Sequence, residues 1–301
     1  MDSSESGEQI DPAVSDAIRT LGNDCRLEIL FTLAEQEWEL KRQGHTLSFT
    51  ELYERSDVES TSQFSYHLTQ LVGTFVAETS EGYRLTYAGE KIVRTVRSGL
   101  YESTPSFETV EVDGTCPFCR ESALVADSRD ERFIIRCSAC DSTLLADAFP
   151  RSQASGRSPA EIVASFGTRL WSAAISVKGG VCPECYGPID IDVDTRETDD
   201  MAFHTLSSTC QQCRMVVHFP VEMLATFHPE IATLRRNRGI TLLETPLWEL
   251  LGYFTGDDWT TEIRSRSPLE VVFEIDVNGE QVRLEVDDTL TVRRRGNSTT
   301  Y

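Results

Sequence analysis

Apolar residues recur at helical spacing through the first part of the chain. The pattern predicts four short helices, and in the last of them Phe64, Leu68 and Leu71 stand at i, i+4 and i+7. Side chains at this spacing form one buried stripe along a helix. The four predicted helices cover residues 13–22, 24–36, 48–56 and 60–72.

A strand pattern follows these helices. Residues 75–89 alternate around a turn at Ser80–Gly82 and predict a hairpin, and residues 90–100 predict one more helix. Short packed helices followed by a hairpin are typical of a winged helix-turn-helix, a common DNA-binding motif. We therefore expect such a domain over residues 12–100, after a disordered acidic tail at residues 1–11.

Two stretches in the middle of the chain alternate between apolar and polar residues and predict strands. The first, residues 114–149, contains ALVADS and RFIIRC, and the second, residues 179–220, contains PIDIDVD and FHTLSSTC. Between them, residues 157–177 carry apolar side chains at helical spacing, and Pro159 suits the first turn of a helix. We expect two small β-modules joined by this helix.

The C-terminal part, residues 221–301, changes from a helical to a strand pattern. We expect a helix from Val221 to about Arg238, and later a hairpin with a type I′ turn at Asn278-Gly279. The segment TLTVRRR would add a third antiparallel strand, and an apolar helix around Trp248 would cover this small sheet. The whole pattern predicts an α+β fold.

The charge of the chain bears on a nucleic-acid function. The sequence has 28 Lys and Arg against 49 Asp and Glu, a formal net charge of −21, and acidic surfaces repel phosphate. Only Lys41, Lys91 and Lys178 are lysines. This composition resembles that of haloarchaeal proteins, which work in molar potassium chloride, where the Debye length falls to about 3 Å. Such screening makes an acidic DNA-binding protein admissible; the alternative is an acidic protein that never meets DNA.

Eight of the nine cysteines form four C-x-x-C pairs, and Cys25 stands alone as an expected small buried apolar residue. In an intracellular chain this pattern favours metal over disulfides. Two pairs brought together by a hairpin supply the tetrahedral all-sulfur environment that zinc prefers, with iron as the alternative. We expect two structural zinc ions in two zinc ribbons, because four protein ligands leave no open position for a substrate. The predicted ligands are Cys116, Cys119, Cys137 and Cys140 in the first module, and Cys182, Cys185, Cys210 and Cys213 in the second.

The predicted helix at residues 60–72 has a polar outer face. No carboxylate occurs between Ser60 and Val72. Polar uncharged side chains can hydrogen-bond to base edges and phosphates, whereas carboxylates would repel the DNA backbone. The candidate DNA-contacting residues are Ser62, Gln63, Ser65, Tyr66 and Thr69 on the helix and Arg84 in the hairpin.

Three segments carry a resemblance to a known family: LGNDCRLEIL, SQFSYHLTQLVGTFV and GYRLTYAG. They resemble the ArsR-like winged-helix family of transcription regulators, including its haloarchaeal members, over about 90 residues. The resemblance implies a homodimer through the first and last helices of the domain, residues 12–22 and 87–100. Metal-sensing members carry cysteines near the recognition helices, and this sequence has none between Asp57 and Val72. That departure argues against a metalloid sensor.

These patterns together predict a homodimeric, sequence-specific regulator of transcription that binds double-stranded DNA. The cysteine modules would serve assembly or effector sensing. The alternative is a zinc-ribbon module that binds protein or RNA and carries a winged helix without DNA-binding activity. The sequence contains no Gly-rich phosphate loop, nucleophile elbow or H-E-x-x-H motif, so we expect no enzyme. Because the sequence shows neither an apolar stretch near the roughly 20 residues of a membrane span nor a signal-peptide pattern, we expect a cytoplasmic protein.

Overall fold

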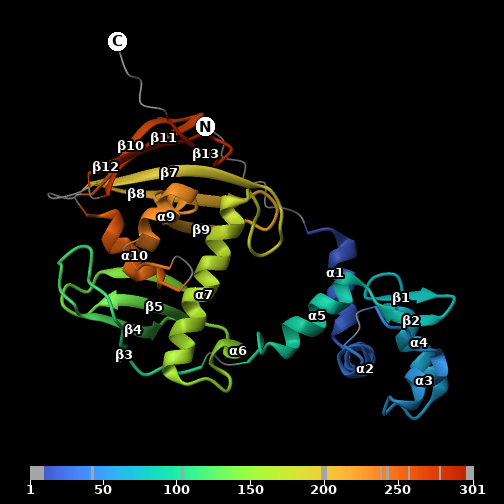
Figure 1. Cartoon of the computed structure of the whole chain (residues 1–301). Coiled ribbons are helices and arrows are strands. Elements are labelled where there is room, and N and C mark those ends of the chain that lie inside the picture. Colours follow the sequence, from blue (N-terminus) through green and yellow to red (C-terminus); the bar gives the residue numbers. More distant parts are fainter. Residues whose placement is uncertain are drawn as a thin grey trace, which may run out of the picture. The chain divides into compact units, whose positions relative to one another are not determined.

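The computed structural model contains two compact units, Met1–Ser103 and Thr104–Tyr301 (Figure 1). Most of the expected acidic tail, and Asn278 of the expected hairpin turn, lie outside the residues that the structure describes. The described residues are 10–41, 44–102, 105–197, 202–237, 239–241, 244–256, 258–277 and 279–295.

The N-terminal unit contains the four helices, the hairpin and the closing helix that the sequence predicts. Their bounds are α1 Pro12–Leu21, α2 Asp24–Glu39, α3 Phe49–Glu54, α4 Thr61–Leu71, β1 Val76–Thr79, β2 Gly82–Leu85 and α5 Tyr87–Arg97. Each helix begins at a polar residue whose side chain accepts a hydrogen bond from the backbone of the first turn, which satisfies a donor that has no partner inside the helix. The capping residues are Asp11, Asn23, Ser48, Ser60 and Thr86.

The core of the N-terminal unit lies between α2, α4 and the hairpin. Its fully buried side chains include Ile29, Leu30 and Leu33 of α2, Phe64, Leu68 and Leu71 of α4, and Val76 and Leu85 of the hairpin. The hairpin also pairs with the chain before α3, where Leu47 and Tyr83 exchange two backbone hydrogen bonds of 2.8 and 2.9 Å. This approach requires glycine at position 82, because a Cβ there would lie 2.3 Å from the Leu47 carbonyl oxygen and φ is +131°.

The first cysteine module of the C-terminal unit is a four-stranded antiparallel sheet. Its strands are β3 Val110–Glu111, β4 Leu124–Arg129, β5 Arg132–Cys137 and β6 Thr143–Ala148, in the order β3-β4-β5-β6. The predicted hairpin ALVADS–RFIIRC forms β4 and β5, while the flanking strands β3 and β6 were not expected. Phe133 and Ile135 of β5 are fully buried, and Ile134 between them is also buried, so this strand has apolar residues packed on both faces.

Helix α7 (Pro159–Lys178) follows the short helix α6 (Arg151–Ala154) and connects the parts of the C-terminal unit. A capping box of Ser158 and Glu161 starts it, with Pro159 in the first turn as expected. Its buried residues belong to successive cores: Phe166 packs with the first module, Trp171 with α10 (Leu247–Phe254), and Val177 with the two sheets described next. Among the described residues, no helix combines the length and the apolar character needed to cross a bilayer.

Two further sheets pack face to face at the other end of α7 (Figure 1). The second cysteine module contributes β7 Ile189–Glu197, β8 Ala202–Cys210 and β9 Val216–Pro220, and the C-terminal sheet contains β10 Trp259–Arg266, β11 Leu269–Val277, β12 Glu280–Val286 and β13 Val292–Arg294. Buried Val193 and Leu206 from the first sheet meet Val271, Phe273 and Leu284 from the second. The strands β11, β12 and β13 were predicted, whereas β10 was not.

The structure differs from the expected single helix over 221–238. Two helices occupy this stretch, α8 (Met223–Thr226) and α9 (Pro229–Asn237). Proline lacks a backbone N–H and clashes with the preceding turn, so it begins a new helix rather than continuing the old one. Helix α10 covers the C-terminal sheet only in part: Phe254 packs against Trp259 of β10, with ring centres 5.4 Å apart. Trp248 instead packs into the core of the first cysteine module, and other apolar residues of α10 pack with Trp171 of α7.

Candidate metal centres and an exposed polar helix

The first cysteine module brings four sulfur atoms together. The Sγ atoms of Cys116 and Cys140 lie 3.7 Å apart, and those of Cys119 and Cys137 lie 3.6 Å apart. All four lie within 4.8 Å of one another. One pair precedes β4 and the other lies at the turn from β5 to β6, so pairing of β4 with β5 carries the two C-x-x-C turns to one point.

The second module repeats this arrangement. The Sγ atoms of Cys182 and Cys213 are 3.6 Å apart, those of Cys185 and Cys210 are 3.4 Å apart, and all four lie within 4.8 Å of one another. The first pair precedes β7 and the second connects β8 to β9. All eight predicted ligands are therefore gathered in two groups of four.

The four C-x-x-C turns share one backbone geometry. In each, the N–H of the first cysteine donates to the carbonyl five residues later, at 2.8 to 2.9 Å. The residue after the second cysteine has a left-handed φ of +57° to +64° in every case, although none of the four is glycine: these residues are Arg120, Asp141, Tyr186 and Arg214. A left-handed non-glycine residue costs conformational energy. The same left-handed residue follows all four C-x-x-C pairs, which indicates that a ligand bound by both cysteines holds each turn in this conformation.

Both groups fit a tetrahedral metal ion that prefers sulfur. A zinc ion with bonds of about 2.3 Å holds its four sulfurs about 3.8 Å apart, close to the 3.4 to 3.7 Å separations found here. Metal ligation requires thiolates. Hydrogen bonds from the Ser142 hydroxyl and backbone lower the pKa of the Cys140 thiol to about 6. Backbone hydrogen bonds, first from Cys213, lower the pKa of the Cys210 thiol to about 6. In the same two groups the backbone hydrogen bonds of Cys119 and Cys213 are outweighed by burial and by the neighbouring thiols, which raise the pKa of each to about 12.

The histidines near the second module have other partners. His204 Nδ1 lies 3.0 Å from the Thr195 hydroxyl, and His218 Nδ1 lies 2.8 Å from the Ser207 hydroxyl. Among the described residues, the groups able to hold a metal ion contain cysteines alone. His204 is therefore packed within the β7–β9 sheet, and His218 lies on its exposed surface.

Helix α4 exposes the polar face that the sequence predicts. Phe64, Leu68 and Leu71 face the core, and Tyr66, on the opposite side, has 60% of its surface exposed. The five candidate DNA-contacting residues of this helix, Ser62, Gln63, Ser65, Tyr66 and Thr69, are all exposed. Arg84 is exposed on β2, where its Nη1 atom lies 3.4 Å from the Leu85 carbonyl oxygen.

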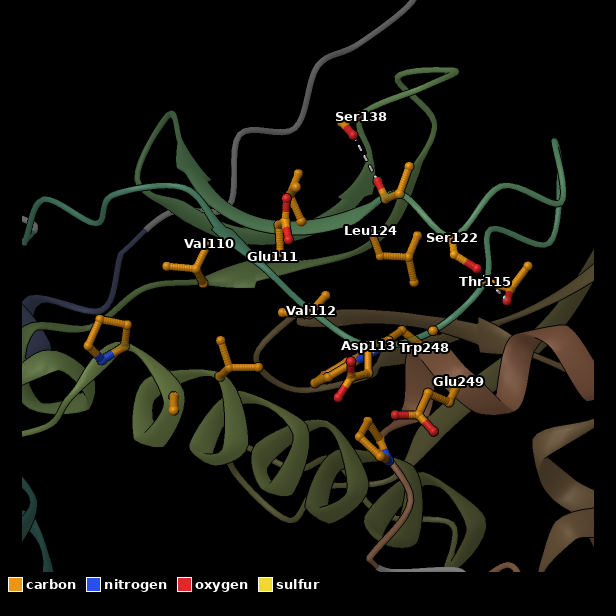
Figure 2. A pocket seen from close by; sticks show the side chains of 17 residues that line it. Val110, Glu111, Val112, Asp113, Thr115, Ser122, Leu124, Ser138, Trp248 and Glu249 are labelled. Atoms are coloured by element: carbon orange, nitrogen blue, oxygen red, sulfur yellow. Dashed lines mark hydrogen bonds between the residues drawn. The ribbon is translucent and has the colours of Figure 1, made fainter.

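A large cavity of about 1030 Å³ lies where the first module meets α7 and α10 (Figure 2). At one end the indole N–H of Trp248 donates to the Asp113 carbonyl oxygen at 3.0 Å, and Glu249 lies beside it. Burial, and then the charge of Asp113, raise the pKa of Glu249. Glu111 is the third carboxylate, and the described lining residues include no basic side chain. This surface repels phosphate, so it does not suit a nucleic-acid backbone.

Two buried charged residues were not singled out by sequence reasoning. Glu222 and Arg235 are only 5% and 7% exposed. Ile231, Leu234 and Arg235 stand at i, i+3 and i+4 on α9 and share its buried face, which is a sequence signal for a guanidinium placed in an apolar stripe. Glu222 stands between apolar residues at the start of α8, and nothing in its sequence context marks it as buried.

Comparison with known families gives two matches along the chain. Residues 14–96 match a domain of unknown function (DUF7347), and residues 113–292 match a second domain of unknown function (DUF7351). No curated protein and no solved structure matches the chain. The second match spans more than half of the 301 residues and includes both four-cysteine groups. The chain therefore belongs to the DUF7351 family.

Proposed function

We propose that this protein is a sequence-specific DNA-binding regulator of transcription. Its N-terminal unit would be a winged helix-turn-helix of the ArsR-like kind, with α4 in the major groove and the β1–β2 hairpin as the wing. The observation that carries the proposal is the exposed face of α4, which is polar and free of carboxylates from Ser60 to Val72 in a chain with 49 acidic residues.

The chemistry of this face suits base-edge contacts. Gln63 offers an amide that can bond adenine in two places, and the hydroxyls of Ser62, Ser65 and Thr69 can bond either bases or phosphates. The Thr69 hydroxyl donates to the Ser65 carbonyl oxygen at 2.8 Å, which leaves its lone pairs available as acceptors. Large apolar residues pack against the buried face of α4 and fix its position, as a helix that recognises bases requires.

The hairpin adds one cationic group to this surface. Arg84 is exposed on β2, and the neighbouring Tyr83 hydroxyl donates to the Glu78 carboxylate at 3.0 Å. A guanidinium in this position would meet a phosphate next to the groove that α4 occupies. Tyr83 would contribute by holding the hairpin in shape.

We infer that the protein acts as a homodimer. Helix α1 has no buried residue, and Val14 (49%) and Ile18 (65%), four residues apart on this helix, are exposed, as is Ile10 (69%) just before it. One apolar stripe on a helix is removed from water when a second copy covers it. The ArsR-like resemblance assigns the same helix to the dimer contact, together with α5.

We also infer that each four-cysteine group holds one structural zinc ion. Bound zinc would cross-link the two turns of each module and supply no chemistry beyond that, because all four ligand positions are protein sulfur. Cys137 and Cys210 are the last residues of β5 and β8, so each zinc ion would also be attached to one of these strands. Such a module is too small to be stable on its apolar core alone.

Paired substitutions on α4 test the proposal. In fluorescence anisotropy on a DNA site recovered by selection, Gln63→Ala with Tyr66→Ala is expected to weaken binding at least tenfold, since each lost base contact is worth about 1–3 kcal/mol. Because both side chains are exposed, thermal stability and zinc content should not change. Gln281→Ala removes another exposed amide, from β12, and serves as the matched control. Unchanged affinity in the α4 variant would refute the assignment of this helix and favour a zinc-ribbon interaction protein.

A further inference from the structure

The acidic cavity of about 1030 Å³ lies beside an edge strand of the first cysteine module. Strand β3 is the first in the order β3-β4-β5-β6, so β4 pairs with one of its edges and the other edge is free. Strand β3 and the first turns of α7, with Pro159, Ala160 and Val163, both line the cavity (Figure 2). The free edge of a strand presents backbone groups with which another extended chain can pair.

The backbone of Glu111 points to this free edge. The next residue, Val112, donates its N–H to the Leu124 carbonyl oxygen of β4 at 3.1 Å. Alternate residues of an antiparallel strand bond the same neighbour, so Glu111 turns its N–H and C=O away from β4, and neither has a hydrogen-bond partner among the described residues. The Asp113 carbonyl, two residues later, accepts the bond from Trp248 of α10. The free edge therefore faces the cavity that Trp248 also lines.

The carboxylates of the cavity determine which charge an added chain can carry. Glu111, Asp113 and Glu249 line the cavity, and the described lining residues include no basic side chain. Glu111 and Asp113 are exposed, so their oxygen atoms are open to a ligand. A cationic side chain among the three carboxylates would offset the repulsion between Asp113 and Glu249. The cavity therefore suits a basic partner.

The two faces of β3 determine the sequence pattern of an added chain. Val110 and Val112 pack against the core of the first module, and Glu111 and Asp113 lie on the other face, because side chains alternate along a strand. Side chains of neighbouring strands contact each other on the same face of a sheet. The residue opposite Glu111 would therefore be basic, and the residues on either side of it would be apolar and lie beside the valines.

We propose that the free edge of β3 accepts an extended segment of a partner protein in which basic and apolar residues alternate. The backbone of this segment would bond the N–H and C=O of Glu111, as in other cases of strand addition. Trp248 limits the length of the pairing, because it already occupies the Asp113 carbonyl. The proposal goes beyond the proposed function, since it requires no DNA binding.

Isothermal titration of the full zinc-loaded chain with a blocked hexapeptide of alternating lysine and valine tests the proposal. In molar potassium chloride, long-range attraction between a basic peptide and an acidic protein is screened. We expect saturable binding at one site per chain. The same peptide with every backbone amide N-methylated keeps its charge and loses its N–H donors, so it should bind about tenfold more weakly. A peptide of alternating glutamate and valine should not bind.

Variants of the chain locate the binding site. Ala160→Trp places a large side chain in the cavity and is expected to abolish binding, whereas Ser172→Trp, at an exposed position further along α7, should bind as the wild type does. Glu111→Gln is expected to weaken binding about threefold, since it removes one exposed charge and keeps both backbone groups. Glu108→Gln, also exposed but outside the cavity lining, is its matched control and should leave the affinity unchanged.

The peptide series and the variants can each overturn the proposal. Absence of saturable binding by the lysine–valine peptide, or equal binding of its N-methylated form, would exclude strand addition. Equal binding to Ala160→Trp and to the wild type would exclude the cavity as the binding site. Equal affinity for the glutamate–valine peptide would overturn the role given to the carboxylates. None of these results would bear on the function of α4.

Discussion

At the scale of single residues, Glu222 is the clearest case of a group whose surroundings change its chemistry. Its Oε1 atom accepts a hydrogen bond from the Thr261 hydroxyl at 2.7 Å, while Oε2 is buried with no partner among the described residues. Burial raises the pKa of this carboxyl from 4.5 to about 7. The folded protein therefore holds a proton on Glu222 that the unfolded chain releases between about pH 4.5 and pH 7.

This shift has a definite sign for stability. The folded state binds more protons than the unfolded state in that range, so Glu222 makes the protein less stable as the pH rises from about 4.5 to about 7, by about 3 kcal/mol in all. Glu222→Gln should remove this loss. The variant is expected to be more stable than the wild type at pH 8 and to differ little from it at pH 4.5, as measured by denaturant unfolding at fixed salt.

A matched substitution separates burial from charge. Glu108→Gln makes the same chemical change at an exposed position. It should shift the unfolding midpoint little at either pH, because the charge of an exposed side chain is well solvated in both states. If Glu222→Gln and Glu108→Gln changed the pH dependence equally, the account of Glu222 as a buried carboxyl would be wrong.

At the scale of elements, each cysteine module depends on its own four sulfurs. Cys137→Ser removes one ligand from the first group and leaves the second intact. We expect the metal content, measured by plasma mass spectrometry, to fall from two zinc ions per chain to one, with loss of stability as the first module opens. Cys25→Ser, at a half-buried position packed against the core of the N-terminal unit, should retain both ions. Two ions in the Cys137→Ser protein would contradict the four-sulfur assignment, and iron in place of zinc would correct the identity of the metal.

The elements also show how far sequence reasoning reaches. Helices with regular apolar spacing agree with the structure: Pro159 lies in the first turn of α7, and α4 begins after Ser60, as the sequence predicts. The eight cysteines were predicted as two groups because C-x-x-C spacing is a local property. The hairpin of β11 and β12 was visible because both strands alternate strictly.

Other elements could not be predicted because their stability comes from distant contacts. The strand β10 has only Trp259 and Ile263 as large apolar residues, and pairing with β11 holds it in place. The strand β3 is two residues long and exists by pairing with β4. The acidic cavity combines residues from β3, β4, α7 and α10, so no single segment of sequence indicates it. The burial of Glu222 likewise depends on contacts with residues distant in the sequence, so it could not be predicted either.

At the scale of the whole molecule, the two units have different proposed roles. We propose that α4 and the hairpin of the N-terminal unit recognise DNA, whereas the C-terminal unit binds metal. The acidic cavity lined by Glu111, Asp113 and Glu249 supports this division, because its charge is wrong for phosphate. An acidic protein can still bind DNA at high salt, where long-range repulsion is screened.

DNA selection from a random library, with zinc-loaded full-length protein in molar potassium chloride, tests this claim most directly. Non-specific attraction to phosphate is largely suppressed at that salt, so enrichment would report on base and shape readout. We expect an enriched motif with two-fold symmetry, as a homodimer requires, and no enrichment with the Gln63→Ala, Tyr66→Ala variant. If the folded, zinc-loaded wild type enriched no motif, the proposed sequence-specific DNA binding would be wrong.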